Sequence, residues 1–309
     1  MKKEQQPTPE FLLIEKRMPD IIGSYCGELR YTIFAVYLYI KISKMNYFNY
    51  STVLLPKLYE ALGRKNNYQT FKAVKEVFDE ILGNDDFGTE LIYPSSLSDI
   101  SMNGFAQFKV AEPSYKFFKL YKEEFDKLFN STYKTKAHLI YVFCTIISKF
   151  YGRNKNDSPK QFPEAWSGSY LMLSDMTGLS VTTLVNIVKE LQNLKLICCK
   201  VPDTECLGKD RFIRIPTIYA RYGQEEELEY KYNQLNMKFN KWRRQKKKTS
   251  QGAAPGQSDG NSDDDWDDAC GTETTTDEWD DGYLEQPCRI DAAANANNNL
   301  FRLFNNVNV

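Results

Sequence analysis

The sequence predicts an α+β fold that is mainly helical, with small β-hairpins, and three observations support this prediction. First, Leu184, Ile187 and Leu191 recur at helical spacing directly after a tight turn. Second, Arg30–Lys44 and Ala137–Tyr151 are apolar on nearly all sides, which is typical of buried helices. Third, the helix, helix and hairpin pattern predicted after the first of these segments occurs again after the second.

The length of 309 residues fits about two domains of ~100–150 residues each. The predicted division is an N-terminal arm at 1–25, a first domain at 26–112, a second domain with a leading helix at 113–223, a charged helix at 224–248 and a disordered acidic tail at 249–309. The tail is rich in Gly, Ser, Asp, Thr and Asn, which cannot bury enough apolar surface to form a core.

In the first domain, the segment after the dense helix contains signals for two further helices and a hairpin. Pro56 favours the start of a short helix that Gly63 closes, and Asn66 is expected to cap a longer helix that ends at Leu82. The strands of the expected hairpin are Leu91–Tyr93 and Phe105–Ala111.

The second domain is expected to begin with an amphipathic helix over Ser114–Phe129. After the dense helix and a polar loop, Ser169 is expected to cap a helix, Gly178 to end it and Ser180 to cap the next one. Two strands follow, Leu196–Cys199 and Arg211–Ile215, separated by a loop.

Short identities accompany the repeated order of elements. Ile42-Ser-Lys44 ends the first dense helix and Ile147-Ser-Lys149 the second, while Val74-Lys-Glu76 and Val188-Lys-Glu190 lie in the two longer helices. Short matches of this kind also arise by chance in lysine-rich helices. The shared order of elements is the stronger indication of an internal repeat.

The turn Met176-Thr-Gly-Leu-Ser180, the helix after it and the following hairpin resemble the winged helix-turn-helix proteins of bacteria. Two such modules in tandem, without a catalytic motif, resemble plasmid and phage replication initiators of the theta type. The helicase-loading primosome proteins of low-GC bacteria are a second resemblance. These families imply binding of origin DNA and recruitment of host helicase or other replication proteins.

Charge is divided unevenly along the chain. The segment after Ser250 holds 13 acidic and two basic residues, a net charge of −11, which leaves +10 for the remainder. A basic body with an acidic tail suits a protein that binds nucleic acid. Trp266 and Trp279 lie within two similar acidic stretches of the tail, and we expect them to dock a partner; the alternative is a solubilising tail.

Double-stranded DNA is the expected ligand, because cations bind phosphate and a helix in the major groove reads bases. Three groups of residues are candidates for these contacts. They are Thr182, Thr183, Asn186, Lys189, Gln192, Lys209 and Arg211 in the second domain; Arg64, Lys65, Asn67, Gln69, Thr70 and Lys72 in the first; and Arg243, Arg244, Lys246, Lys247 and Lys248 as a non-specific basic run.

Catalytic motifs are absent from the sequence. His138 is the single histidine and lies in an apolar segment, and there is no Walker A pattern, Gly-x-Ser-x-Gly or zinc-spaced Cys/His cluster. We therefore expect no enzyme activity, no cofactor and no metal site.

The seven cysteines include no CxxC pair, and the apolar segments fall short of the ~20 residues that cross a membrane. Both observations favour a cytoplasmic protein with reduced thiols and no membrane contact. Cys26 and Cys144 are expected to be buried in helices, and Cys198 and Cys199 to point to opposite faces of a strand.

Two other functions fit the same modules. One is a transcriptional regulator, which would bind a single operator-like site. The other is an adaptor that uses winged helices to bind proteins. The first domain, with its tyrosine-rich helix, is the expected site of homodimerisation. In the charged helix, an apolar edge is expected to pack on the body or to self-associate; it consists of Leu228, Leu235 and Phe239 with Tyr232 and Trp242.

Overall fold

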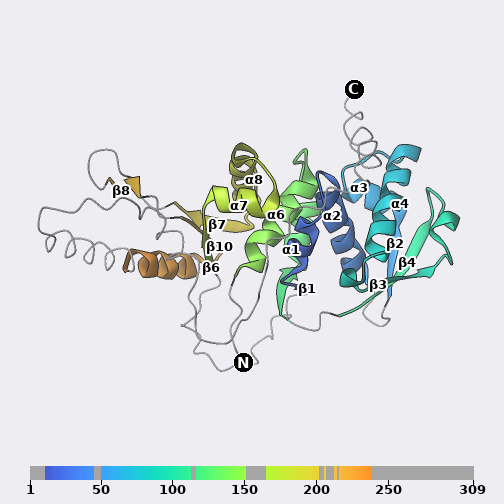
Figure 1. The fold of residues 1–309 in the computed structure, drawn as a ribbon, viewed down its shortest axis with the longest axis horizontal. Coiled ribbons are helices and arrows are strands. Elements are labelled where there is room, and N and C mark those ends of the chain that lie inside the picture. The colour runs from blue at the N-terminus through green and yellow to red at the C-terminus, as the bar shows by residue number, and fades with distance from the viewer. Residues whose placement is uncertain are drawn as a thin grey trace, which may run out of the picture. The chain divides into compact units, whose positions relative to one another are not determined.

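A computed structural model describes residues 11–44, 50–112, 116–150, 165–201, 205–206, 212–213 and 216–237 of the chain (Figure 1). It contains both helices and sheets, which confirms the α+β class. The described residues as far as Asn236 belong to one compact unit, which we call the first unit. Both expected domains lie within the first unit.

The first half of this unit contains eight principal elements. In order, they are β1 (Phe11–Glu15), α1 (Met18–Gly23), α2 (Leu29–Ile42), β2 (Tyr50–Leu54), α3 (Leu55–Ala61), α4 (Tyr68–Leu82), β3 (Thr89–Tyr93) and β4 (Phe105–Val110). Single 3-10 turns, η1 (Asp85–Phe87) and η2 (Leu97–Asp99), flank β3. The three-stranded antiparallel sheet has the order β2-β4-β3.

The second half repeats this order of elements. It contains β5 (Phe117–Tyr121), α5 (Lys122–Phe129), α6 (Lys136–Ser148), β6 (Ala165–Gly168), α7 (Tyr170–Thr177), α8 (Val181–Asn193), β7 (Ile197–Lys200) and β10 (Thr217–Arg221). Its sheet has the order β6-β10-β7, which corresponds strand for strand to the first sheet. Each half therefore runs strand, helix, helix, strand, helix, helix, strand, strand.

The two halves are joined at their first strands and by their central helices. β1 pairs with β5 in antiparallel register, with Leu13 opposite Lys119. α2 packs against α6, and the rings of Phe34 and Tyr141 meet edge to face with centroids 5.4 Å apart. Both helices are buried along most of their length, because their sequences are apolar on nearly all sides. Tyr31 and Tyr37 of α2 are buried and Tyr39 is half-buried, so homodimerisation through the first domain stays a prediction.

A short helix covers the outer face of the second sheet. Residues 225–237 are helical, and Leu228, Tyr232 and Leu235 pack on a cluster that includes Ile218 and Ala220. The expected apolar edge of the charged helix therefore packs on the body. The part of the predicted helix after residue 237, and the tail at 249–309, lie outside the described residues.

The expected helix over Ser114–Phe129 is wrong in its first part. Phe117–Tyr121 forms β5, with Phe118 and Leu120 buried and Phe117 exposed, and α5 begins only at Lys122. The alternation of burial is that of a strand, and its partner β1 lies about one hundred residues earlier in the chain. Residues 11–23, which we expected in an N-terminal arm, contribute Ile14, Met18 and Ile22 to the core.

The hairpin of the second half also differs from the prediction. The partner of β7 is β10, whereas Phe212–Ile213 forms β9 and pairs with β8 (Glu205–Cys206). In every pair of both ladders, the two residue numbers have the same sum, as for Cys199 with Tyr219 and Cys206 with Phe212. The β8–β9 pairing therefore continues the β7–β10 hairpin in one register. Of the expected strand Arg211–Ile215, the described residues Phe212–Ile213 therefore belong to the outer end of this hairpin.

The cysteines follow the prediction except at one position. Cys144 is fully buried in α6, and Cys199 faces the main core while Cys198 faces the cluster under residues 225–237. Cys26 is exposed and lies between α1 and α2, not in an apolar helix. Among the residues that the structure describes, no single helix is long and apolar enough to cross a membrane.

Candidate nucleic-acid interface

The helix α8 presents a polar face to solvent next to a tight turn. Ser180 caps it by accepting a hydrogen bond from the Thr183 amide at 3.3 Å, as its position before an apolar repeat predicted. The apolar side of the helix is buried in the core through Leu184, Ile187, Val188 and Leu191. The opposite side is therefore free to meet a ligand.

Four of the five candidates on this helix are exposed, namely Thr182, Asn186, Lys189 and Gln192. Thr183 is half-buried, and its hydroxyl lies 2.9 Å from the Ser180 hydroxyl. It therefore takes part in the cap of the helix, and its contact with DNA stays a prediction.

The turn before α8 depends on a glycine. α7 is capped by Ser169, which accepts from the Met172 amide at 3.0 Å, and it ends at Gly178 with φ of +72°. A residue with a Cβ is strained at this φ, whereas glycine is not. Both caps and the glycine of this turn follow the prediction.

In the first half, α4 has the corresponding place. Its N-cap is Asn67, which accepts from the Thr70 amide at 2.8 Å. The expected cap, Asn66, instead donates to Asn103 Oδ1 at 2.8 Å and so ties the turn to the β3–β4 connection. The Asn67 side chain is thus occupied by the cap and Thr70 is half-buried, and the exposed candidates here are Arg64, Lys65, Gln69 and Lys72.

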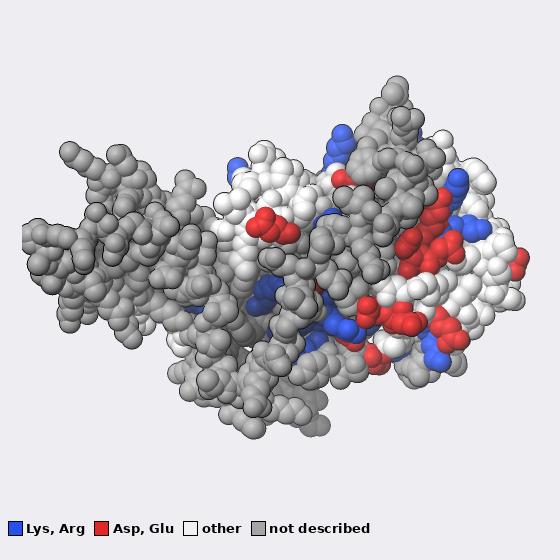
Figure 2. Space-filling view, viewed as in Figure 1, with Lys and Arg blue, Asp and Glu red and all other residues white. Residues whose placement is uncertain are grey.

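Charge is graded along α4. Lys65 precedes the helix and Lys72 lies in its second turn, while Asp79 and Glu80 lie in the last turns. Figure 2 shows acidic side chains gathered on this side of the first half. The N-terminal end of α4 is therefore the end that DNA phosphates would approach.

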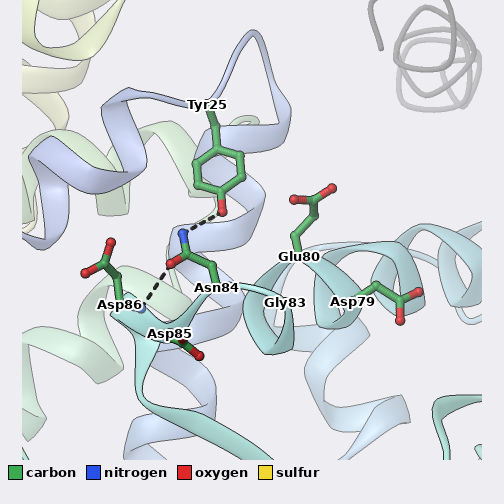
Figure 3. A pocket seen from close by; sticks show the side chains of 7 residues that line it. All are labelled: Tyr25, Asp79, Glu80, Gly83, Asn84, Asp85 and Asp86. Atoms are coloured by element: carbon green, nitrogen blue, oxygen red, sulfur yellow. Dashed lines mark hydrogen bonds between the residues drawn. The ribbon is translucent and has the colours of Figure 1, made fainter.

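The acidic end of α4 borders a pocket of about 570 Å³ (Figure 3). Asn84 stands at its centre, donating to the Tyr25 hydroxyl at 3.1 Å and accepting from the Asp86 amide at 3.0 Å. The carboxylates that line it are those of Asp79, Glu80, Asp85 and Asp86. Their charge repels phosphate, so this pocket lies outside the candidate interface.

Sequence reasoning missed the residues that hold the turn before α8. The Tyr31 hydroxyl, from α2 of the first half, donates to the Thr177 carbonyl oxygen at 2.8 Å, and Arg30 Nη1 lies 3.5 Å from the same oxygen. The available signal was weak, because a tyrosine in an apolar helix gives no indication of which carbonyl its hydroxyl reaches.

His138 is occupied within the protein core. Its Nε2 lies 2.6 Å from Glu28 Oε2, and its ring meets the ring of Tyr31 edge to face with centroids 4.2 Å apart. His138 is therefore buried, as its place in an apolar segment indicated.

The remaining candidates lie outside the described residues or in segments whose side chains are not described. They are Lys209 and Arg211 at the hairpin, Arg243, Arg244, Lys246, Lys247 and Lys248 in the basic run, and Trp266 and Trp279 in the tail.

No protein-family model matches this chain, and a search of curated proteins finds no match to it.

Proposed function

We propose that this protein binds duplex DNA sequence-specifically through two winged helix-turn-helix modules. The reading helices are α4 and α8, and the wings are the hairpins β3–β4 and β7–β10. The observation that carries the proposal is the repeated helix-turn-helix and hairpin, in which α8 buries its apolar side and exposes Thr182, Asn186 and Lys189. Short polar side chains on such a helix bond base edges and phosphates.

The biological role proposed for this binding is initiation of plasmid or phage replication. Support comes from the tandem arrangement of the modules and from the resemblance of the Met176–Ser180 turn to such initiators. Recruitment of host helicase or other replication proteins is assigned to the acidic tail with Trp266 and Trp279. A single operator-like target would instead indicate a transcriptional regulator.

The test is selection of bound duplexes from a random pool by the full chain, followed by affinity measurements on the selected site. Asn186→Ala is expected to weaken binding to that site by roughly 1–3 kcal/mol if Asn186 reads a base. Asn193→Ala, on the same helix but in its last turn, is the matched control and should leave the affinity unchanged.

Salt dependence separates this proposal from the adaptor alternative. Contacts to phosphate make the affinity fall as salt rises, whereas a module that binds only proteins shows no salt-sensitive affinity for duplex DNA. If the full chain showed no measurable binding to the unselected duplex pool at low salt, the proposal would be overturned.

A further inference from the structure

The two helix-turn-helix turns lie beside the starts of central helices that belong to the opposite half. Gly178, in the turn of the second half, is so close to α2 of the first half that a Cβ there would lie 2.8 Å from Arg30 Nη1. Gly63, in the turn of the first half, lies beside the start of α6 of the second half, with Lys136 Cε 3.5 Å from where its Cβ would be. Both glycines have left-handed backbones, with φ of +72° and +69°.

The contact to the second turn is made through hydrogen bonds. The last carbonyl groups of a helix have no partner within it. At the end of α7, the Thr177 carbonyl is satisfied by the buried Tyr31 hydroxyl at 2.8 Å, with Arg30 Nη1 at 3.5 Å. The Thr177 hydroxyl in turn donates to the Leu173 carbonyl at 2.6 Å and faces the Leu179 amide at 3.4 Å. The position of Thr177 therefore determines where the chain enters α8.

The contact to the first turn is made through packing. Lys136 Nζ donates to the Phe129 carbonyl at the end of α5, at 2.9 Å, and its side-chain stem lies over Gly63. This support contributes no hydrogen bond to the turn that precedes α4. Residues at the starts of α2 and α6 thus contact the two turns differently, through hydrogen bonds at the second turn and through packing at the first.

The starts of α2 and α6 are themselves locked together. Glu28, just before α2, pairs with His138 in the first turn of α6 at 2.6 Å. The His138 ring packs on Tyr31, the residue that holds the second turn. We call Glu28, Arg30, Tyr31, Lys136 and His138 the junction.

We propose that the junction positions each helix-turn-helix turn from the opposite half, with Tyr31 as the residue that positions the turn before α8. This inference rests on the proposed function, because it assigns to Tyr31 a role in DNA binding by α8. A residue of the first half then controls base contacts made by the second half, without touching DNA.

The test compares Tyr31→Phe with Tyr141→Phe in the full chain. Both changes remove a buried tyrosine hydroxyl that donates to a backbone carbonyl, Thr177 for Tyr31 and Pro19 for Tyr141, and both leave the ring in place. The first readout is hydrogen exchange of the amides of residues 178–184 without DNA. Tyr31→Phe is expected to speed exchange there roughly 5-fold, since one buried hydrogen bond is lost, and Tyr141→Phe to leave it unchanged.

The second readout is affinity for the selected duplex and for duplexes changed at single positions. Tyr31→Phe is expected to weaken binding roughly 5-fold and to reduce discrimination at the base pairs that Asn186→Ala identifies, but not elsewhere. The inference would be overturned by equal hydrogen exchange in the two variants, or by a loss of discrimination spread evenly over all base pairs of the selected duplex. If the wild-type chain binds no duplex but Tyr31→Phe still speeds hydrogen exchange, the result supports positioning by Tyr31 and overturns only the proposed function.

Discussion

The two halves have the same order of elements, but their sheets differ in what lies on the outer face. On the second sheet, Ala165, Ile218 and Ala220 are fully buried beneath residues 225–237. On the first sheet, Thr52 and Gln107 bond to each other at 3.3 Å, and Lys109 pairs with Glu90 at 3.5 Å. A repeated fold therefore tolerates either composition, and the presence of a covering helix decides between apolar and polar side chains.

The halves also differ at the end of the last strand. β4 ends in the buried Val110, whereas β10 ends in Arg221, which is buried against Glu124 and the Lys119 carbonyl. The Arg221 guanidinium also lies 5.0 Å from the centre of the Tyr121 ring. In the second half, an ion pair thus joins the sheet to β5 and α5.

The largest effect is expected from removing one partner of this pair. Arg221→Met should lower the free energy of unfolding by about 3 kcal/mol, because it leaves the Glu124 carboxylate buried without a cation. Burial already raises the pKa of Glu124 above its ordinary value of 4.5, with Arg221 opposing the shift. Without Arg221 the folded state holds the Glu124 proton more tightly than the unfolded chain does. The loss should therefore be full near pH 7 and shrink as the pH falls toward 4.5.

Denaturant unfolding of Arg221→Met at several pH values measures this loss. The double variant Glu124→Leu with Arg221→Met is the control and should recover most of the stability, since no charge remains buried. A loss that does not depend on pH would show that the packing of Arg221, and not its charge, joins the sheet to α5.

A smaller effect is expected from the helix that covers the second sheet. Leu228→Ala should cost roughly 2–3 kcal/mol, because Leu228 is 7% exposed and its removal opens the cluster under the helix. Ile92→Ala, on the first half, truncates an aliphatic side chain that is 47% exposed and should cost less than about 0.5 kcal/mol. Thermal unfolding of both variants measures the difference. Equal losses would contradict the contrast between a covered and an uncovered sheet.

The smallest effect is expected where the halves agree. Asn67→Ala and Ser180→Ala each remove an N-cap that accepts from the third residue of the following helix, and each should cost about 1 kcal/mol. Asn66→Ala is the control, because Asn66 bonds a neighbouring loop and not the helix amides. A markedly larger loss for one cap, measured by denaturant unfolding, would show that local capping does not support α4 and α8 alike.

Local signals in the sequence were sufficient to predict much of the helix-turn-helix part of the second half. Ser169, Gly178 and Ser180 act within one helical turn of their own positions, so the boundaries of α7 and α8 were predictable. The spacing of Leu184, Ile187 and Leu191 likewise determined which side of α8 is buried and left Asn186 exposed. In the first module two neighbouring asparagines offer the same cap, and the structure assigns it to Asn67.

Long-range pairing decided what the sequence did not show. Phe117–Tyr121 fits a helix as well as a strand by composition, and it is a strand because β1 lies beside it. The hydrophobicity of Tyr31 predicted burial in α2, but only the packing of α2 against α6 brings its hydroxyl to Thr177.

The sequence by itself determined α7 and α8, their caps and the buried side of α8, because these depend on residues three or four positions apart. Tertiary structure decided the β1–β5 join and the junction at Tyr31, because these contacts connect residues more than one hundred positions apart. Such contacts leave no periodic trace in the sequence, since each is made by a single side chain or strand whose partner is set by how the two halves pack.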